Sequence, residues 1–223
     1  MTGEASSKPV LGIVGGTGLL GTGLARRWTT AGYTVIIGSR DPARAKDAAA
    51  LISLSPVEGK VEGASNIDAA AAADIVIVAV PFNHQAELID SIRPALRGQI
   101  VLDTTVPLIP HSTALVRLPQ FGSAALTAQR HLGSAARVLS AFHNIPAKRL
   151  AKDEPIDCDV LVFDDSAEDR ESIIALVEAA GLRGLHGGPL ANSVAAEALT
   201  SVLIGIQRHY HTRVAGIRIT GID

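Results

Sequence analysis

The feature that most constrains the fold is a glycine-rich motif that follows a short apolar run. Residues 10–14 are apolar and rich in β-branched side chains, which is typical of a strand buried on both faces. The next residues form the GxGxxG motif Gly16-Thr17-Gly18-Leu19-Leu20-Gly21. Apolar residues at helical spacing then run from Leu19 to Ala31. This order of strand, glycine turn and helix is typical of the first unit of a dinucleotide-binding sheet.

The same alternation of strand and helix continues along the chain. Strands are expected at residues 34–37, 75–80, 100–103, 138–142, 160–163 and 182–186. Helices are expected at residues 42–51, 84–96 and 168–180, from Leu190 towards His211, and at Ala69–Ala73 with Asn66 as the cap. Most of these strands are apolar throughout, so we expect them to be buried on both faces and joined by right-handed crossovers. We predict an α/β fold, a Rossmann-type doubly wound parallel sheet, with an NADP-binding domain at residues 1–146 and a smaller C-terminal α/β lobe at residues 147–223.

The charge and cysteine content argue against several kinds of function. Lys and Arg number 20 and Asp and Glu number 22, and the net charge of −2 leaves no strong field to attract nucleic acid or an anionic membrane. The single cysteine, Cys158, has no partner for an internal disulfide, and no Cys/His spacing suggests a metal site. The N-terminus lacks the apolar core of a signal peptide, and no later apolar run approaches the roughly 20 residues of a membrane span. We therefore expect a cytoplasmic protein with small-molecule partners and no metal.

Each glycine of the motif has a geometrical role in binding a dinucleotide. Gly16 permits a tight turn, Gly18 lets the backbone approach a pyrophosphate, and Gly21 lets the helix pack closely on the strand. The N–H groups at the start of the helix then face the phosphates. A glycine turn without a ligand is the alternative, but the position between a strand and a helix favours binding.

The end of the second expected strand indicates which dinucleotide is bound. An NAD site usually carries Asp or Glu there, whereas this chain has Ser39 and Arg40, with Arg44 one helical turn later. One hydroxyl and two guanidinium groups suit the 2′-phosphate of NADP. The alternative is that both arginines are solvated residues at a helix start, and the adjacent Asp41 weakens the preference for NADP.

Two loops at the carboxyl ends of strands carry the remaining candidates. Val80, Pro81, Phe82 and His84 follow one strand, at the edge where ligands of open α/β sheets bind. The His84 side chain either contacts the cofactor or faces water. His143 follows the strand at residues 138–142 and is the candidate catalytic residue, because it could donate a hydrogen bond to a ring carbonyl and support a reduced anion. The alternative is a core histidine bonded to backbone.

Five segments together resemble one family, the NADPH-dependent reductases of the deazaflavin coenzyme F-420 (F420). They are GGTGLLG at residues 15–21, IGSR at 37–40, AVPFNH at 79–84, SAFHNIPA at 140–147 and GGPLANS at 187–193. The resemblance covers nearly the whole chain. It implies a homodimer in which NADP(H) and F420 lie ring to ring and exchange a hydride directly, without a metal.

The resemblance also implies a role for each motif residue. The dinucleotide would lie along Thr17, Leu19 and Leu20, with its 2′-phosphate on Ser39, Arg40 and Arg44 and its nicotinamide beside Pro81, Phe82 and His84. The deazaflavin side would consist of His143, Asn144, Ile145, Pro146, Ala147, Pro189, Leu190 and Asn192. The smaller lobe would supply part of the deazaflavin pocket and the dimer contacts.

Two other functions remain open at this point. One is an NADP-dependent reductase of another acceptor, such as a flavin, a quinone or an imine. The other is a dinucleotide sensor without turnover. The candidate residues of a second pocket, from His143 to Asn192, argue against it.

Overall fold

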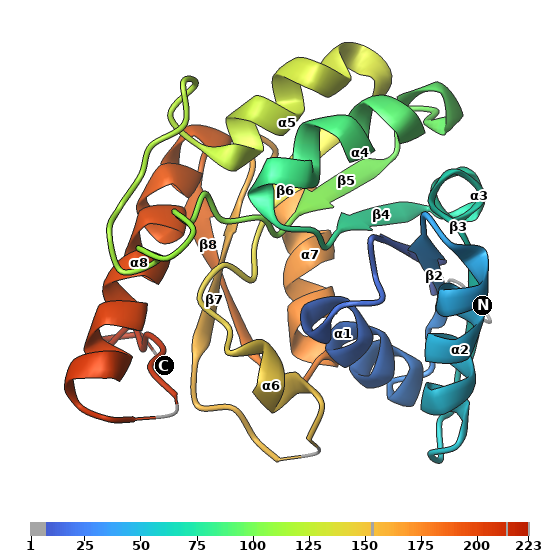
Figure 1. Ribbon diagram of the computed structural model, residues 1–223, viewed down its shortest axis with the longest axis horizontal. Coiled ribbons are helices and arrows are strands. Elements are labelled where there is room, and N and C mark those ends of the chain that lie inside the picture. Colours follow the sequence, from blue (N-terminus) through green and yellow to red (C-terminus); the bar gives the residue numbers. More distant parts are fainter. Residues whose placement is uncertain (1–7, 153, 213, 223) are drawn as a thin grey trace, which may run out of the picture.

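The computed structural model describes residues 8–152, 154–212 and 214–222 and contains one eight-stranded sheet (Figure 1). The strand order is β3-β2-β1-β4-β5-β6-β7-β8. All neighbouring strands run parallel except β6 and β7, which are antiparallel and pair only at Ser140 and Phe163. The strands are β1 (Leu11–Val14), β2 (Thr34–Ser39), β3 (Lys60–Ser65), β4 (Ile75–Val78), β5 (Ile100–Asp103), β6 (Arg137–Ser140), β7 (Asp159–Phe163) and β8 (Arg183–Gly188). The predicted α/β fold with a doubly wound sheet is confirmed.

Helices cover both faces of the sheet, and Figure 1 shows α4 and α5 above it and α1 and α7 below it. The helices are α1 (Leu19–Thr30), α2 (Pro42–Ser53), α3 (Asn66–Ala72), α4 (Gln85–Ile92), α5 (Ala124–Leu132), α6 (Ala147–Leu150), α7 (Ala167–Ala179) and α8 (Ser193–His209). Short 3-10 turns include η1 (Phe82–His84) and η4 (Leu190–Asn192). Ile75 and Ile77 of β4 belong to the core below the sheet, whereas Val76 and Val78 belong to the core above it. This is why the strand is apolar throughout.

Several expected elements differ from the structure. The edge strand β3 was not predicted, because its Lys60 and Glu62 are exposed and it lacks an apolar run. Helix α5 was not predicted either. The cap of α3 is Ser65, whose hydroxyl accepts from the Asp68 N–H, and not Asn66 as expected. Strands from both predicted domains lie in one continuous sheet, and the division at residue 146 stays a prediction.

One helical stretch differs from the expectation that no apolar run reaches the length of a membrane span. Leu190–His209 comprises 20 residues with a mean hydropathy of 1.3, which is sufficient by length and composition alone. Core helices pass the same test. Within α8 the Glu197 side chain is only 2% exposed and accepts hydrogen bonds from the first residues of α5. These contacts pack α8 against the start of α5, although only 33% of the apolar stretch is buried.

Candidate functional site

The glycine loop after β1 is held from two sides. The Gly15 N–H donates to Asn66 Oδ1 at 2.9 Å, and the Gly16 N–H donates to the Gly38 carbonyl at 2.9 Å. Gly15 has a φ of +68°, so the left-handed residue of the turn is Gly15, one residue before the motif. Gly16 lies in the same turn, and the turn is tight there because a Cβ on Gly16 would lie 2.5 Å from the Ile13 carbonyl oxygen.

The other two glycines of the motif differ in what surrounds them. A Cβ on Gly21 would lie 2.5 Å from the Gly16 carbonyl oxygen, as expected for close packing of helix on strand. A Cβ on Gly18 would meet no described atom within 4 Å, because Gly18 borders open space. Gly18 is also the N-cap of α1, and no side chain caps this end of the helix. The first N–H groups of α1 are thus available to an anion beside Gly18.

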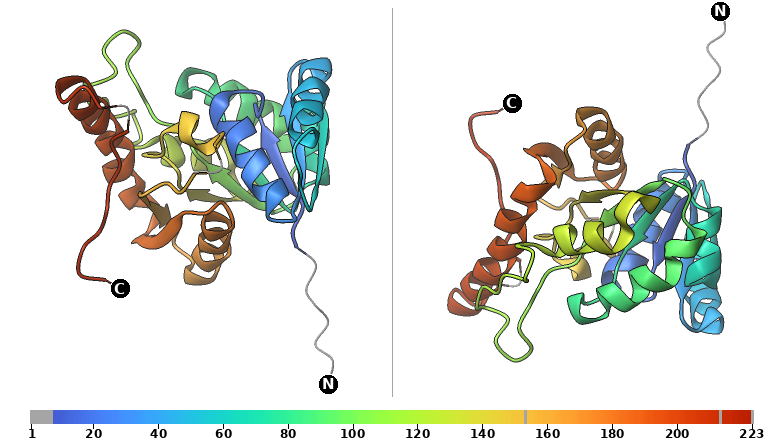
Figure 2. Two further views of the ribbon diagram at one scale, coloured as in Figure 1. Left: turned by 90° about the horizontal axis from the view of Figure 1, so that it is seen from below. Right: turned by 90° about the horizontal axis from the view of Figure 1, so that it is seen from above.

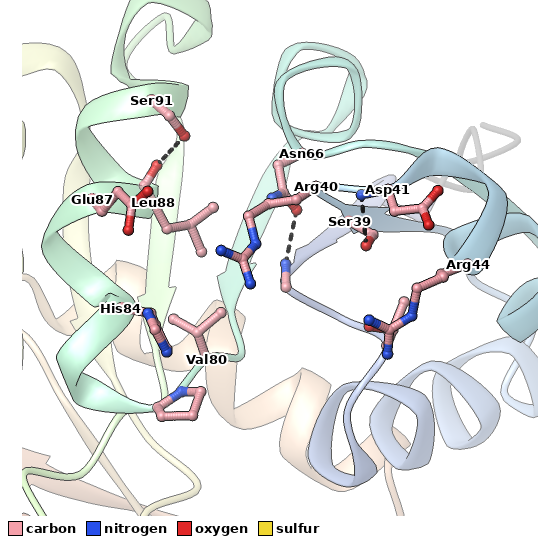
Figure 3. Close-up of a pocket in the computed structure, with 13 residues that line it drawn as sticks. Ser39, Arg40, Asp41, Arg44, Asn66, Val80, His84, Glu87, Leu88 and Ser91 are labelled. Carbon is pink, nitrogen blue, oxygen red and sulfur yellow. Dashed lines mark hydrogen bonds between the residues drawn. The ribbon is translucent and has the colours of Figure 1, made fainter.

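A cleft of about 460 Å³ lies beside the loop, between the ends of β2 and β4 (Figure 3). Seven of its residues were predicted from the sequence: Thr17, Ser39, Arg40, Arg44, Val80, Pro81 and His84. Six further residues line it: Gly15, Asp41, Asn66, Glu87, Leu88 and Ser91. The cleft therefore joins segments that are far apart in the sequence but meet at the carboxyl edge of the sheet.

The two arginines give the cleft its charge. Arg40 and Arg44 are exposed and extend from opposite sides of the β2 end (Figure 3). Neither side chain forms an ion pair within residues 8–152, 154–212 and 214–222. Asp41 lies between them in the sequence, but its carboxylate accepts from the Ala43 N–H at 3.0 Å and caps α2. Two guanidinium groups are thus free to bind a phosphate.

Asn66 is a site residue that the sequence analysis treated only as a helix cap. Its side-chain oxygen holds the Gly15 N–H, so α3 fixes the glycine loop directly. The side chain is 7% exposed. Its position after β3 could have suggested this role, but β3 itself was not recognised in the sequence.

His143 lies beyond the end of β6, outside this cleft, and is buried. Its side chain is 5% exposed, its Nε2 lies 2.7 Å from Ser140 Oγ, and its carbonyl accepts from Thr200 Oγ1 at 2.9 Å. Burial lowers the pKa of His143 to about 3. The imidazole is therefore neutral at physiological pH, and it can act as a hydrogen-bond donor but not as a cation.

The other residues expected on the deazaflavin side fall into two groups. Asn144 is buried, and its amide donates to Cys158 Sγ at 3.1 Å and to the Asp159 carbonyl at 3.0 Å, so its contacts fix the loop. Ile145 and Leu190 are also buried, and η4 packs beside the ends of β6 and β7. Four residues remain at least partly exposed: Pro146, Ala147, Pro189 and Asn192. The structure thus brings the two segments to the same end of the sheet.

Two buried carboxyl groups near this edge were not identified from the sequence. Asp103 ends β5 and is fully buried. Burial raises its pKa to about 6, although hydrogen bonds from Gln85 and Thr105 lower the pKa. Burial raises the pKa of Glu197 to about 8, although the N–H groups of Ala124 and Ala125 favour its charged form. In the described ranges, no group of three or more His, Cys, Asp or Glu side chains could hold a metal ion.

Glu197 should make the protein less stable as the pH rises. A carboxyl group whose pKa is higher in the folded than in the unfolded chain binds its proton more tightly when folded. The free energy of unfolding should therefore fall between about pH 5 and pH 8, by at most about 1.4 kcal/mol per pH unit. We expect urea unfolding at several pH values to show this slope in the wild type and a flatter one above pH 6 in Glu197→Gln. Equal slopes in both proteins would contradict the assignment.

Comparisons with known proteins identify the family and the fold. The family model "NADP oxidoreductase coenzyme F420-dependent" matches residues 10–107. The F420-dependent NADP reductase of Methanothermobacter thermautotrophicus is 40% identical over 222 residues, which is 95% of each chain. That of Methanothermobacter marburgensis is 37% identical and covers 95% of this chain and 98% of its own. The crystal structure of a protein from Arthrobacter sp. FB24, described as a putative F420-dependent NADP reductase, has a TM-score of 0.79 at 20% identity and covers 96% of this chain.

Proposed function

Because this chain belongs to the family of F420-dependent NADP oxidoreductases, we propose that its cleft holds NADP(H) with the nicotinamide next to a bound F420. The protein is an oxidoreductase that transfers a hydride between NADP(H) and F420. The observation that carries the site assignment is the cleft itself, which joins an uncapped helix N-terminus to two unpaired arginines. A pyrophosphate and a 2′-phosphate are the groups that such a cleft recognises.

The residues of the cleft bind and orient the adenosine half of the dinucleotide. Ser39, Arg40 and Arg44 bind the 2′-phosphate, and the backbone from Gly16 to Gly21, with Thr17, Leu19 and Leu20, follows the pyrophosphate. Val80, Pro81 and His84 form the opposite wall. Phe82, which lies between them in the sequence but does not line the cleft, is expected beside the nicotinamide. Leu19 is 59% exposed, so its side chain is available to cover the ligand.

The deazaflavin side lies at the ends of β6 and β8. Hydride transfer needs two rings held in contact with water excluded, and the rings themselves supply the chemistry. We propose that the Ser140 hydroxyl donates to His143 Nε2, which places the imidazole proton on Nδ1 and makes Nδ1 a donor towards a ring carbonyl. Asn144, Ile145, Pro146, Ala147, Pro189, Leu190 and Asn192 form the rest of this wall.

The activity is tested by mixing oxidised F420 with NADPH and the protein and following the deazaflavin absorbance. We expect protein-dependent bleaching, and a rate at least about 10-fold lower for His143→Phe because the donor to the reduced ring is lost. Absence of bleaching, with NADPH binding confirmed by calorimetry, would contradict the assignment of F420 as the acceptor. A wild-type rate in His143→Phe would contradict only the role of His143.

We also propose that the enzyme is a homodimer that associates through α8. Figure 2 shows α8 at the end of the molecule away from α2 and α3. Val202 and Ile206 of α8 are 45% and 40% exposed. Leu115 and Leu118 in the adjacent loop are 61% and 59% exposed, and the loop is tied to α8 by a bond from Arg208 to Thr113 of 2.6 Å. Exposed apolar side chains on adjoining segments are typical of a subunit interface.

A charge in this surface should separate the subunits. Two carboxylates buried at an apolar contact would cost more than the contact provides. We expect the double variant Val202→Glu/Ile206→Glu to elute as a monomer in size-exclusion chromatography with light scattering, while the wild type elutes as a dimer. Leu54→Glu, at a leucine that is 82% exposed on the other side of the fold, is the matched control and should stay dimeric. A monomeric wild type would contradict the proposal.

We propose a cytoplasmic location, with small-molecule co-substrates as partners and neither nucleic acid nor a membrane involved. The single cysteine, Cys158, is free and buried, and needs no oxidising compartment. Cell fractionation should recover the protein with the cytosolic enzymes. Recovery in the membrane pellet would contradict this location.

A further inference from the structure

The first residue of α4, Gln85, forms a buried hydrogen-bond cluster behind the cleft. It directly follows His84, which lines the cleft, yet its own side chain is only 1% exposed. Its amide nitrogen lies 2.9 Å from Asp103 Oδ2, 2.7 Å from Thr105 Oγ1 and 3.1 Å from the Ala124 carbonyl. One side chain thus connects α4, the end of β5, the loop after β5 and the start of α5.

The partners of Gln85 also bind one another. The Thr105 hydroxyl lies 3.0 Å from both Asp103 oxygens and donates to that carboxylate, which leaves its oxygen free to accept from Gln85. The neighbouring Thr104 hydroxyl donates to the Val78 carbonyl at 2.7 Å, which ties the same loop to the end of β4. Asp103 and Thr105 are 0% and 2% exposed. The loops after β4 and β5 are therefore fixed to each other by groups that do not reach solvent.

The orientation of the Gln85 amide follows from these partners. All three neighbours offer an oxygen to accept a hydrogen bond, so the nitrogen must face them. The amide oxygen, Oε1, is buried and has no hydrogen-bond donor among the described residues. A buried acceptor without a donor lowers stability. An apolar side chain would avoid that cost but would leave the buried Asp103 carboxylate and the Ala124 carbonyl without this donor, so Gln85 is needed for its N–H groups.

The place of the cluster relative to the cleft indicates its role. The arginines at the end of β2 fix the adenosine end of the dinucleotide, and the glycine loop at β1 fixes the pyrophosphate. The nicotinamide end of the dinucleotide must then continue across the ends of β4 and β5, beyond the point between β1 and β4 where the strand order reverses. We infer that Gln85, with Asp103 and Thr105, positions the loops after β4 and β5 so that the nicotinamide is held in the geometry needed for hydride transfer. This inference rests on the proposed function and makes Gln85 a positioning residue.

A matched pair of glutamines tests this role. Gln99 precedes β5 at the opposite edge of the sheet, and its amide donates to the carbonyls of Ala70 and Ala73 at 3.2 and 3.3 Å. It therefore also joins a helix to the sheet, but far from the site. Gln85→Met and Gln99→Met remove comparable hydrogen bonds while keeping the side-chain length. Three quantities are measured for each: the dissociation constant of NADPH, the single-turnover rate of F420 reduction and the fluorescence of the bound nicotinamide.

We expect Gln85→Met to lower the single-turnover rate at least about 10-fold and to change the NADPH dissociation constant less than about threefold. The fluorescence of the bound nicotinamide should move towards that of free NADPH. Gln99→Met should leave all three quantities at the wild-type values. A wild-type rate and fluorescence in Gln85→Met, or equal losses in both variants, would overturn the inference.

If Gln85→Met does not fold, Thr105→Val removes only the hydroxyl of the cluster and should show the same changes, and unchanged rate and fluorescence in that variant would overturn the inference. If the wild type itself does not reduce F420, the proposed function fails. The nicotinamide fluorescence then decides the role of Gln85 alone, because it needs no acceptor.

Discussion

Replacing both Arg40 and Arg44 by Ala is expected to raise the dissociation constant of NADPH about 100-fold while changing that of NADH less than about threefold. A hydrogen bond to a charged group contributes about 1.5–3 kcal/mol, and two lost contacts of this kind correspond to at least two orders of magnitude in affinity. NADH lacks the 2′-phosphate, so it loses nothing at these positions. Calorimetric titration of both dinucleotides measures the difference.

A cation on the same helix serves as the control for this experiment. Lys46 is exposed on α2 and does not line the cleft. Lys46→Ala should leave both dissociation constants unchanged, which excludes a general loss of positive charge as the cause. Equal weakening of NADPH and NADH in the double variant would show that the arginines do not bind the 2′-phosphate.

Gly21→Ala should abolish NADPH binding and lower stability, whereas Gly18→Ala should lower binding alone. The added methyl at Gly21 would lie 2.5 Å from the Gly16 carbonyl oxygen and 2.6 Å from its Cα, so α1 and the glycine loop must move apart. Clashes of this kind cost about 1–3 kcal/mol, and we expect more than 100-fold weaker NADPH binding because the loop loses its shape. At Gly18 the methyl meets no protein atom within 4 Å and would occupy the space assigned to the pyrophosphate.

The contrast between the two variants makes the test specific. We expect the free energy of unfolding of Gly18→Ala to stay within about 1 kcal/mol of the wild type while its NADPH affinity falls about 10-fold or more. Urea unfolding and calorimetry on the same preparations give both quantities. Undiminished affinity in Gly18→Ala would mean that the pyrophosphate does not lie at the start of α1.

The sequence allows most of the sheet to be predicted because its central strands are buried on both faces. β1 and β4 are apolar throughout, β5 is apolar up to its last residue, Asp103, and these strands stand out from the helices between them. The edge strand β3 has polar residues on its exposed side, so its identity depends on pairing with β2, which no local pattern reveals. The family resemblance, confirmed by the comparisons, supplied the activity but not this strand.

The site was predicted where it follows from local spacing and not where it follows from tertiary contacts. The glycine motif and the arginines after β2 are recognisable from neighbouring residues alone. Asn66, Gln85 and Glu197 act through partners more than 15 residues away, and an isolated polar residue in a helix carries no sign of such a partner. Gly16 lies in the expected turn, but the positive φ of that turn is at Gly15, which the spacing of the motif does not specify.

The only tryptophan of the chain gives the enzyme a built-in optical probe. Trp28 of α1 is fully buried, its indole N–H donates to the Leu176 carbonyl at 2.8 Å, and its ring meets Phe142 edge-on at 6.0 Å. Its emission comes from one buried environment on α1, the helix whose start we propose binds the pyrophosphate. The ring it contacts, Phe142, directly precedes His143. Reduced nicotinamide absorbs where indole emits, so energy transfer can report the arrival and the oxidation of NADPH in real time without any label.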